Sequence, residues 1–150
     1  GGEMTHLADC YCGSGLFAIS AADSFETVVG IEINDKAVEE AKNNALKNDK
    51  TNCEFIAASS EGIFENIQHF PRDTSVVVLD PPRKGCSTEF LDQLYKFNPK
   101  RIVYMSCDPI TQARDAEGIT SAGYAITMVQ PFDLFPQTRH IECLMILERP

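Results

Sequence analysis

The stretch "TVVGIEINDKAVEEAKNNALKND", residues 27–49, changes its periodicity partway along. Residues 27–33 are mainly β-branched and apolar, as is typical of a strand. Beyond Asn34 and Asp35, either of which can cap a helix, apolar residues recur at helical spacing. These apolar residues are Ala37, Val38, Ala41, Ala45 and Leu46. The stretch therefore predicts a strand followed by an amphipathic helix over residues 34–49.

The same alternation continues on both sides of this stretch. Apolar runs predict further strands at residues 6–12, 53–58, 75–80 and 101–106. Helical patterns follow them at residues 16–25, 60–70, 87–97 and 109–122. Ser87 or Thr88 can cap the helix at 87–97, and Gly123 is a stop signal for the helix before it. The unbroken apolar run at 75–80 is expected at the buried centre of a parallel sheet.

The carboxyl-terminal part of the chain departs from this alternation. Residues 124–135 and 140–149 are two strand-like runs joined by "PQT", which leaves no room for a helix. Such runs predict a hairpin at one edge of the sheet. Residues 1–150 are therefore expected to form one doubly wound α/β domain, mostly parallel, with an antiparallel edge strand from the C-terminal hairpin.

The composition limits the class of function. A net charge of −9 argues against binding nucleic acid by bulk electrostatics alone. Three basic pairs could still form a local rim: Arg83–Lys84, Lys100–Arg101 and Arg139–His140. Six cysteines without a C-x-x-C spacing favour a reduced intracellular protein with no metal site. Since no apolar run reaches membrane-spanning length, we expect no membrane association and a cytoplasmic, nuclear or mitochondrial location.

Residues suited to a small ligand follow three of the predicted strands. Ligands of open α/β sheets bind outside the carboxyl ends of the strands. Gly13 and Gly15 follow the first strand and permit a tight turn and close approach of a ligand. Glu32 ends the second strand and can accept hydrogen bonds from ribose hydroxyls, and Asp80 ends the fourth. A dinucleotide and S-adenosylmethionine both fit this trio, because Ala18 is an acceptable third residue of the dinucleotide fingerprint.

Cys107 lies within "RIVYMSCDPITQARD", residues 101–115, between a predicted strand and a predicted helix. Cysteine is usually a small buried apolar residue. A thiol at a strand-to-helix junction, however, lies where backbone dipoles favour the thiolate. From the residues alone, Cys107 is either a packing residue or a nucleophile.

Five blocks of the chain together resemble one family. They are "DCYCGSGLFAIS", "VVGIEI", "VVVLDPPRKG", "RIVYMSCDPITQARD" and "PFDLFPQTRHIE". In this order they resemble the catalytic domain of the RNA uracil-C5 methyltransferases, most closely the eukaryotic, fungal-type members that act on tRNA. The resemblance covers essentially the whole chain. It implies a Rossmann-like class I methyltransferase sheet, S-adenosylmethionine as cofactor and an RNA substrate, tRNA in particular. It also implies that the family's amino-terminal RNA-binding domain is absent from these residues.

The resemblance assigns roles to individual residues. Tyr11, Glu32 and Asp80 match cofactor contacts of the family, beside the loop that contains Gly13 and Gly15. Cys107 matches the nucleophile that adds to C6 of uracil, and Glu142 matches the general base that removes the C5 proton. The candidates for the uracil pocket are Phe132, Phe135 and Pro136, and those for phosphate or enolate contacts are Arg139 and His140. A uracil in folded RNA must leave its stack to reach these groups.

Three other functions remain open at this stage. A cytosine-C5 methyltransferase shares the thiol addition but commonly has a second cysteine after proline, where this chain has "DPPRKG". An amino-group methyltransferase with a D-P-P-Y loop would have an aromatic residue in place of Arg83. A non-catalytic module would bind nucleoside or RNA without forming a covalent adduct.

Overall fold

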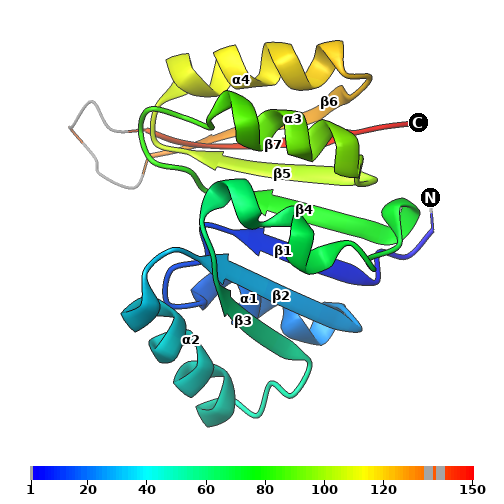
Figure 1. The fold of residues 1–150 in the computed structure, drawn as a ribbon. Coiled ribbons are helices and arrows are strands. Elements are labelled where there is room, and N and C mark those ends of the chain that lie inside the picture. Colours follow the sequence, from blue (N-terminus) through cyan, green and yellow to red (C-terminus); the bar gives the residue numbers. More distant parts are fainter. Residues whose placement is uncertain (1, 134–136, 138–140) are drawn as a thin grey trace.

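The computed structural model describes residues 2–133, 137 and 141–150, and these form a seven-stranded sheet flanked by helices (Figure 1). The strands are β1 (His6–Cys10), β2 (Thr27–Glu32), β3 (Cys53–Ala57), β4 (Ser75–Leu79), β5 (Arg101–Ser106), β6 (Ala125–Phe132) and β7 (Glu142–Glu148). The α-helices are α1 (Leu16–Ala21), α2 (Asp35–Lys47), α3 (Thr88–Phe97) and α4 (Pro109–Ser121). The order across the sheet is β3-β2-β1-β4-β5-β7-β6, which confirms the predicted doubly wound α/β fold.

Strands β1 to β5 pair in parallel, and β7 pairs antiparallel with both β5 and β6. The hairpin is at the edge of the sheet as predicted, but the reversed strand β7 lies one place inside it and β6 is outermost. The register between β5 and β7 runs from Arg101 opposite Glu148 to Ser106 opposite Cys143. A 2.6 Å ion pair between Arg101 and Glu148 stabilises one end of this register.

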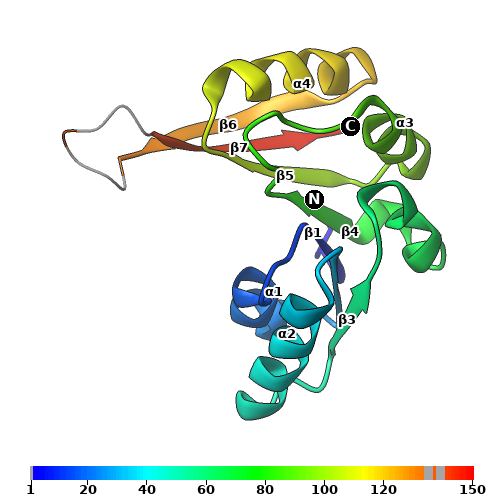
Figure 2. The ribbon, with the colours of Figure 1, turned by 60° about the vertical axis from the view of Figure 1, so that its left-hand side comes forward.

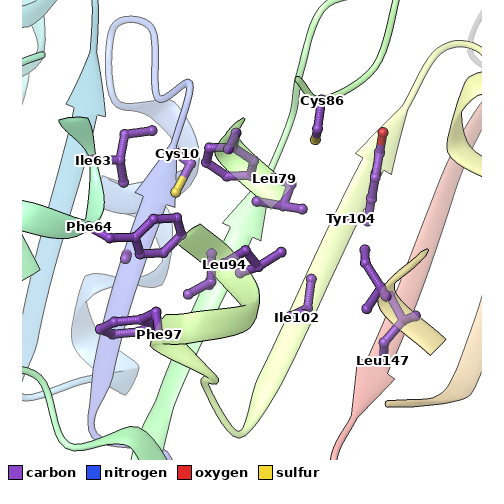
Figure 3. Close-up of a cluster of buried hydrophobic side chains, with 14 of the residues drawn as sticks. Cys10, Ile63, Phe64, Leu79, Cys86, Leu94, Phe97, Ile102, Tyr104 and Leu147 are labelled. Carbon is purple, nitrogen blue, oxygen red and sulfur yellow. The ribbon is translucent and has the colours of Figure 1, made fainter. Parts of the chain in front are cut away.

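The helices cover both faces of the sheet (Figures 1 and 2). On one face, α3 and α4 pack on a core that includes Leu94, Ile102, Tyr104 and Leu147 (Figure 3). On the other face, α1 and α2 pack on a second core that includes Phe55. Alternate residues of a strand point to opposite faces, so an inner strand such as β1 contributes to both cores. This two-sided burial fixes the carboxyl ends of the strands, where the site lies.

One local prediction is wrong. Residues 60–70 form no α-helix; they contain the 3₁₀ turns Ser60–Gly62 and Phe64–Ile67. Gly62 costs about 1 kcal/mol in a helix interior, and Pro71 disfavours helical backbone just before it. In α2, Leu46 is 76% exposed, because only Val38, Ala41 and Ala45 face the sheet.

Other predicted ends move by a few residues. The first helix ends at Ala21 and continues as a 3₁₀ turn, Ala22–Ser24. Asn34 caps α2 through a hydrogen bond from the Ala37 amide, and Ser87 caps α3 through one from Phe90. These caps resolve the two predicted pairs of candidates in favour of the first residue of each pair.

Candidate active site

The three loops predicted to bind a ligand meet at the carboxyl ends of the central strands. Strand β1 lies between β2 and β4, and Cys10 at its end is opposite both Ile31 and Leu79. The residues that follow these three positions are Tyr11, Glu32 and Asp80. The fold therefore brings the predicted cofactor residues together.

The glycine loop has the backbone that its sequence predicts. Gly13 and Gly15 have φ values of 55° and 84°, and Tyr11 between β1 and Gly13 is also left-handed, with φ 63°. A Cβ on Gly15 would lie 2.9 Å from the Phe55 ring, so this position needs glycine for space as well as for backbone conformation. The loop thus turns tightly over the end of β1.

A cavity of about 90 Å³ lies between Tyr11 and the end of β2, lined by Glu32, Ala58 and Ser60. Packing holds the Tyr11 ring, whose centroid is 5.6 Å from that of Phe90. One oxygen of Glu32 accepts a hydrogen bond from the Asn34 amide at 2.8 Å. A carboxylate has about four acceptor sites, so Glu32 can also accept hydrogen bonds from a ligand hydroxyl.

A second cavity, of about 160 Å³, shares the lining residue Tyr11 with the first. It is lined by Asp9, Tyr11, Cys12, Leu16, Phe17, Val78, Asp80 and Met105. Leu16 and Phe17 are 78% and 45% exposed at its edge. Its wall is thus largely apolar, with two carboxyl groups, a composition that suits a ligand with an apolar body and a positive charge.

Asp9 is the one carboxyl of this cavity that sequence reasoning missed. It is only 2% exposed, and one of its oxygens has no hydrogen-bond partner. Burial raises the pKa of Asp9 to about 7. A hydrogen bond from the Ala18 amide opposes this rise, and repulsion from Asp80 adds to it. An acidic residue inside an apolar strand was the signal available, because a charged group is seldom buried without a partner.

Asp80 lies at the mouth of the same cavity. Desolvation by the surrounding protein raises the pKa of its carboxyl, and repulsion from Glu142 raises it further. This repulsion places the charge of Glu142 near Asp80, although the two residues are far apart in the sequence. The predicted base and the predicted cofactor residue therefore share one region.

A short turn holds Cys107 at the end of β5. The Ser106 hydroxyl accepts a hydrogen bond from the Asp108 amide at 3.0 Å and donates one to the Asp108 carbonyl at 2.9 Å. The Asp108 carboxylate accepts hydrogen bonds from the amides of Ile110 and Thr111, and Pro109 occupies the first turn of α4. Both flanking residues are thus fixed, and Cys107 is left half-buried between them.

The strand register brings Cys107 close to Glu142. The last paired residues of β5 and β7 are Ser106 and Cys143, so Cys107 and Glu142 are the next positions on their respective strands. Successive side chains of a strand point to opposite faces of the sheet, so Glu142 shares a face with Leu144. Leu144 pairs with Met105, which lines the second cavity. The two predicted catalytic residues and the two carboxyl groups of the cavity lie at one end of the sheet.

Arg83 and Lys84 lie in the loop before α3, where their carbonyls accept hydrogen bonds from Thr111 and Arg114 of α4. The other remaining candidates divide into three groups. Phe132 pairs with Glu142 and is 41% exposed, so it lies beside the site. Phe135, Pro136, Arg139 and His140 lie outside the described residues. Lys100 and Arg101 lie at the amino end of β5, opposite the site, and bond to Arg149 and Glu148, so they form no rim around it.

Three further observations concern the described residues alone. All six cysteines are free thiols. Within residues 2–133, 137 and 141–150, no group of three or more His, Cys, Asp and Glu side chains could hold a metal ion. No helix in this part of the chain has the length and apolar character needed to cross a membrane.

Comparisons with known proteins identify relatives. A family model described as tRNA (Uracil-5-)-methyltransferase matches residues 2–150. The chain is 43% identical over 148 residues to the tRNA (uracil(54)-C(5))-methyltransferases of Schizosaccharomyces pombe and Saccharomyces cerevisiae. These alignments cover 96% and 95% of this chain, and 28% and 23% of the respective relatives.

A solved structure is similar over nearly the whole chain. It is that of the Pyrococcus abyssi tRNA (uracil-54, C5)-methyltransferase in complex with S-adenosyl-L-homocysteine, with a TM-score of 0.83 and 33% sequence identity. The match covers 98% of this chain and 34% of that protein. The chain thus spans between about a quarter and a third of the length of these relatives.

Proposed function

The chain belongs to the tRNA (uracil-5-)-methyltransferase family, and from this premise we propose that residues 1–150 are the catalytic domain of an enzyme that methylates C5 of a uridine in tRNA. The observation that carries the proposal is the register that puts Cys107 and Glu142 at adjacent strand ends, beside the cavity of Asp9 and Asp80. The names of the relatives suggest uridine 54 as the target. Such a substrate implies an intracellular protein.

The two cavities fit S-adenosylmethionine. Glu32 and Tyr11 would hold the ribose and the adenine side, because a carboxylate accepts hydrogen bonds from ribose hydroxyls. Asp9 and Asp80 would face the positively charged ammonium and sulfonium groups of the cofactor. These charges would compensate the buried Asp9 carboxylate, one oxygen of which has no hydrogen-bond partner. S-adenosylmethionine supplies the methyl group that C5 of uracil receives.

Cys107 would act as the nucleophile. Its thiolate forms a bond to C6 of uracil, and the electron pair of the C5–C6 double bond moves to C5 and the O4 carbonyl as an enolate. C5 would then take the methyl group as the sulfonium–methyl bond breaks, which leaves S-adenosylhomocysteine, and C5 would still carry its original hydrogen. The turn through Ser106 and Asp108 holds the sulfur at a fixed position for this addition.

Glu142 would complete the reaction. Its carboxylate takes the proton from C5, the C5–C6 double bond re-forms, and the C6–sulfur bond breaks to release the Cys107 thiolate. Strand β7 holds the Glu142 carboxylate on the same face as the cavity, next to the position of Cys107.

The test is covalent trapping by tRNA that contains 5-fluorouridine, incubated with the full-length protein and S-adenosylmethionine. Fluorine cannot leave as a proton, so we expect a stable protein–RNA adduct on a denaturing gel. Cys107→Ala should abolish both the adduct and methylation. Glu142→Gln should retain the adduct but reduce turnover on ordinary tRNA by about 10²-fold or more. Cys53→Ala, which changes a cysteine on the β3 edge of the sheet, is the matched control and should behave as wild type.

Each contrary outcome identifies what is wrong. Methylation of uridine without an adduct, or with Cys107→Ala active, would refute the covalent mechanism. A methylated cytosine or amino group in the product would instead identify one of the alternative methyltransferases. Binding of tRNA and cofactor without any methyl transfer would leave a non-catalytic module.

A further inference from the structure

Helix α4 carries a buried polar residue on the face that packs against the sheet. Gln112 is 2% exposed and lies three residues after Pro109, the first residue of α4. Most of the residues buried around it are apolar, and an amide in such a place needs hydrogen-bond partners. Its partners are main-chain groups of two different strands.

One amide nitrogen of Gln112 connects β5 and β7. Its Nε2 donates hydrogen bonds to the carbonyl of Tyr104 and to the carbonyl of Cys143, both at 3.1 Å. Tyr104 precedes Cys107 by three residues, and Cys143 directly follows Glu142. Gln112 therefore links the two strands near the end of their register, three residues before the proposed nucleophile on β5 and directly after the proposed base on β7.

The two proposed catalytic residues do not depend on this link to the same degree. Cys107 is held independently, because Ser106 and Asp108 bond across it and Asp108 caps α4. Glu142 is the first residue of β7, and the register of β5 with β7 ends at its neighbour Cys143. On its other side Glu142 pairs with Phe132, the last residue of the outermost strand β6. A loss of the Gln112 bonds should therefore displace Glu142 more than Cys107.

We infer that Gln112 is a positioning residue that holds Glu142 at the correct distance from the uracil bound to Cys107. The inference rests on the proposed function and deepens it, because it assigns Gln112 to one step of the reaction. Removing its side-chain donors should slow removal of the C5 proton and leave the thiol addition and methyl transfer nearly unchanged. A displacement of about 1 Å in such a group can cost about 10²-fold in rate.

Asp115 provides a matched comparison on the same helix. It is also 2% exposed, and its carboxylate accepts hydrogen bonds from the Cys86 amide at 2.9 Å and the Tyr104 hydroxyl at 2.7 Å. The first bond holds the loop before α3 against α4, and the second joins β5 to α4. Asp115→Asn therefore weakens buried polar contacts of α4 without touching the bond to β7.

The experiment compares full-length wild type with Gln112→Met, Asp115→Asn and the exposed-site control Glu117→Gln. Two rates are measured for each: single-turnover formation of the 5-fluorouridine adduct, and kcat on ordinary tRNA. We expect Gln112→Met to lower kcat by about 10- to 100-fold while adduct formation stays within about 3-fold of wild type. Ordinary tRNA should then accumulate as a covalent intermediate in this variant. Asp115→Asn should lower both rates in parallel, and Glu117→Gln should lower neither.

A parallel loss of both rates in Gln112→Met, or no loss of either, would overturn the inference. If this variant does not fold, Gln112→Leu, which also lacks donors, is measured in its place. Wild type that forms no adduct would overturn the proposed function and the inference with it. If wild type forms the adduct, and Gln112→Met changes adduct formation and kcat by the same factor relative to wild type, only the inference about Gln112 is overturned.

Discussion

The carboxyl of Asp9 carries an electrostatic cost in the free protein. Its pKa is raised from 3.8 to about 7, chiefly by burial, so near neutral pH the folded protein resists an ionisation that the unfolded chain has already undergone. Stability from this group is fully present below about pH 4 and is lost as the pH rises through 7. A cationic ligand would reverse the penalty, so the same feature that destabilises the free protein favours binding.

Asp9→Asn should therefore raise the free energy of unfolding and at the same time weaken binding of S-adenosylmethionine. At pH 8 we expect the variant to gain about 2 to 4 kcal/mol in free energy of unfolding, because each pKa unit corresponds to about 1.4 kcal/mol. At pH 4 we expect little difference between variant and wild type. Urea unfolding between pH 4 and 8 measures this, and calorimetric titration should show at least about ten-fold weaker binding of S-adenosylmethionine. Equal pH slopes in the two proteins would contradict the assignment.

Single residues differ in how well a sequence reveals them. Glu32 and Asp80 could be placed at the site because strand ends mark the ligand-binding edge of a doubly wound sheet. For Asp9 the sequence offers one signal, an acidic residue inside an apolar strand, but it does not show the buried oxygen without a partner. Gln112 could not be placed, because its partner Cys143 is distant in the sequence. Lys100 and Arg101 were candidates by charge, but the sequence does not show that the amino end of β5 faces away from the site.

At the scale of elements, the loop before α3 meets α4 closely at Gly85. This residue has φ 82°, and a Cβ there would lie 2.5 Å from Nη2 of Arg114 and 2.7 Å from Oδ2 of Asp115. The Arg114 side chain is flexible, but Asp115 is fixed by its bonds to Cys86 and Tyr104. The contact therefore ties the segment that follows Asp80 to the helix that follows Cys107.

Gly85→Ala should cost about 2 to 4 kcal/mol, the sum of left-handed strain and overpacking. Gly123→Ala is the control, because Gly123 also has positive φ, 106°, but has no atom within 4 Å of an added Cβ. The control should pay backbone strain alone, about 1 to 2 kcal/mol. Chemical denaturation of both variants measures the difference. Equal costs would show that the loop can move away from α4.

The order of elements was predictable, whereas their long-range pairing was only partly so. Alternating strand and helix patterns correctly indicated five parallel strands and a terminal hairpin. The insertion of β7 between β5 and β6 was not foreseen, since a local pattern does not say which side of a hairpin meets the sheet. Residues 60–70 were misassigned because their buried residues Ile63, Phe64, Ile67 and Phe70 also have helical spacing.

At the scale of the whole molecule, charge opposes the proposed substrate. A protein with a net charge of −9 repels the phosphate backbone of RNA, whereas it attracts a cationic cofactor. The 150 residues therefore combine a favourable field for S-adenosylmethionine with an unfavourable one for tRNA. The affinity for tRNA that the proposed function requires would therefore come from local contacts or from surfaces outside these residues.

We expect the 150-residue chain to bind tRNA with a Kd of about 10⁻⁵ M or weaker at physiological salt. Fluorescence anisotropy with labelled tRNA measures this, and calorimetric titration with S-adenosylmethionine on the same sample verifies that the chain is folded. The full-length protein is the reference and should bind more tightly. Binding by the 150 residues alone at nanomolar Kd would refute the view that charge limits this domain.

The position of β7 between β5 and β6 has a consequence for biosynthesis. A ribosome completes β6 before β7, at about 5 to 20 residues per second, so the emerging β6 has no neighbour on the sheet with which to pair. The nascent chain therefore exposes an open edge of β5 until β7 arrives. Cys107 is translated well before Glu142, and insertion of a single late strand both covers the edge of β5 and brings the proposed base next to the proposed nucleophile. A polypeptide released before that moment would have the thiol of the proposed mechanism without its base.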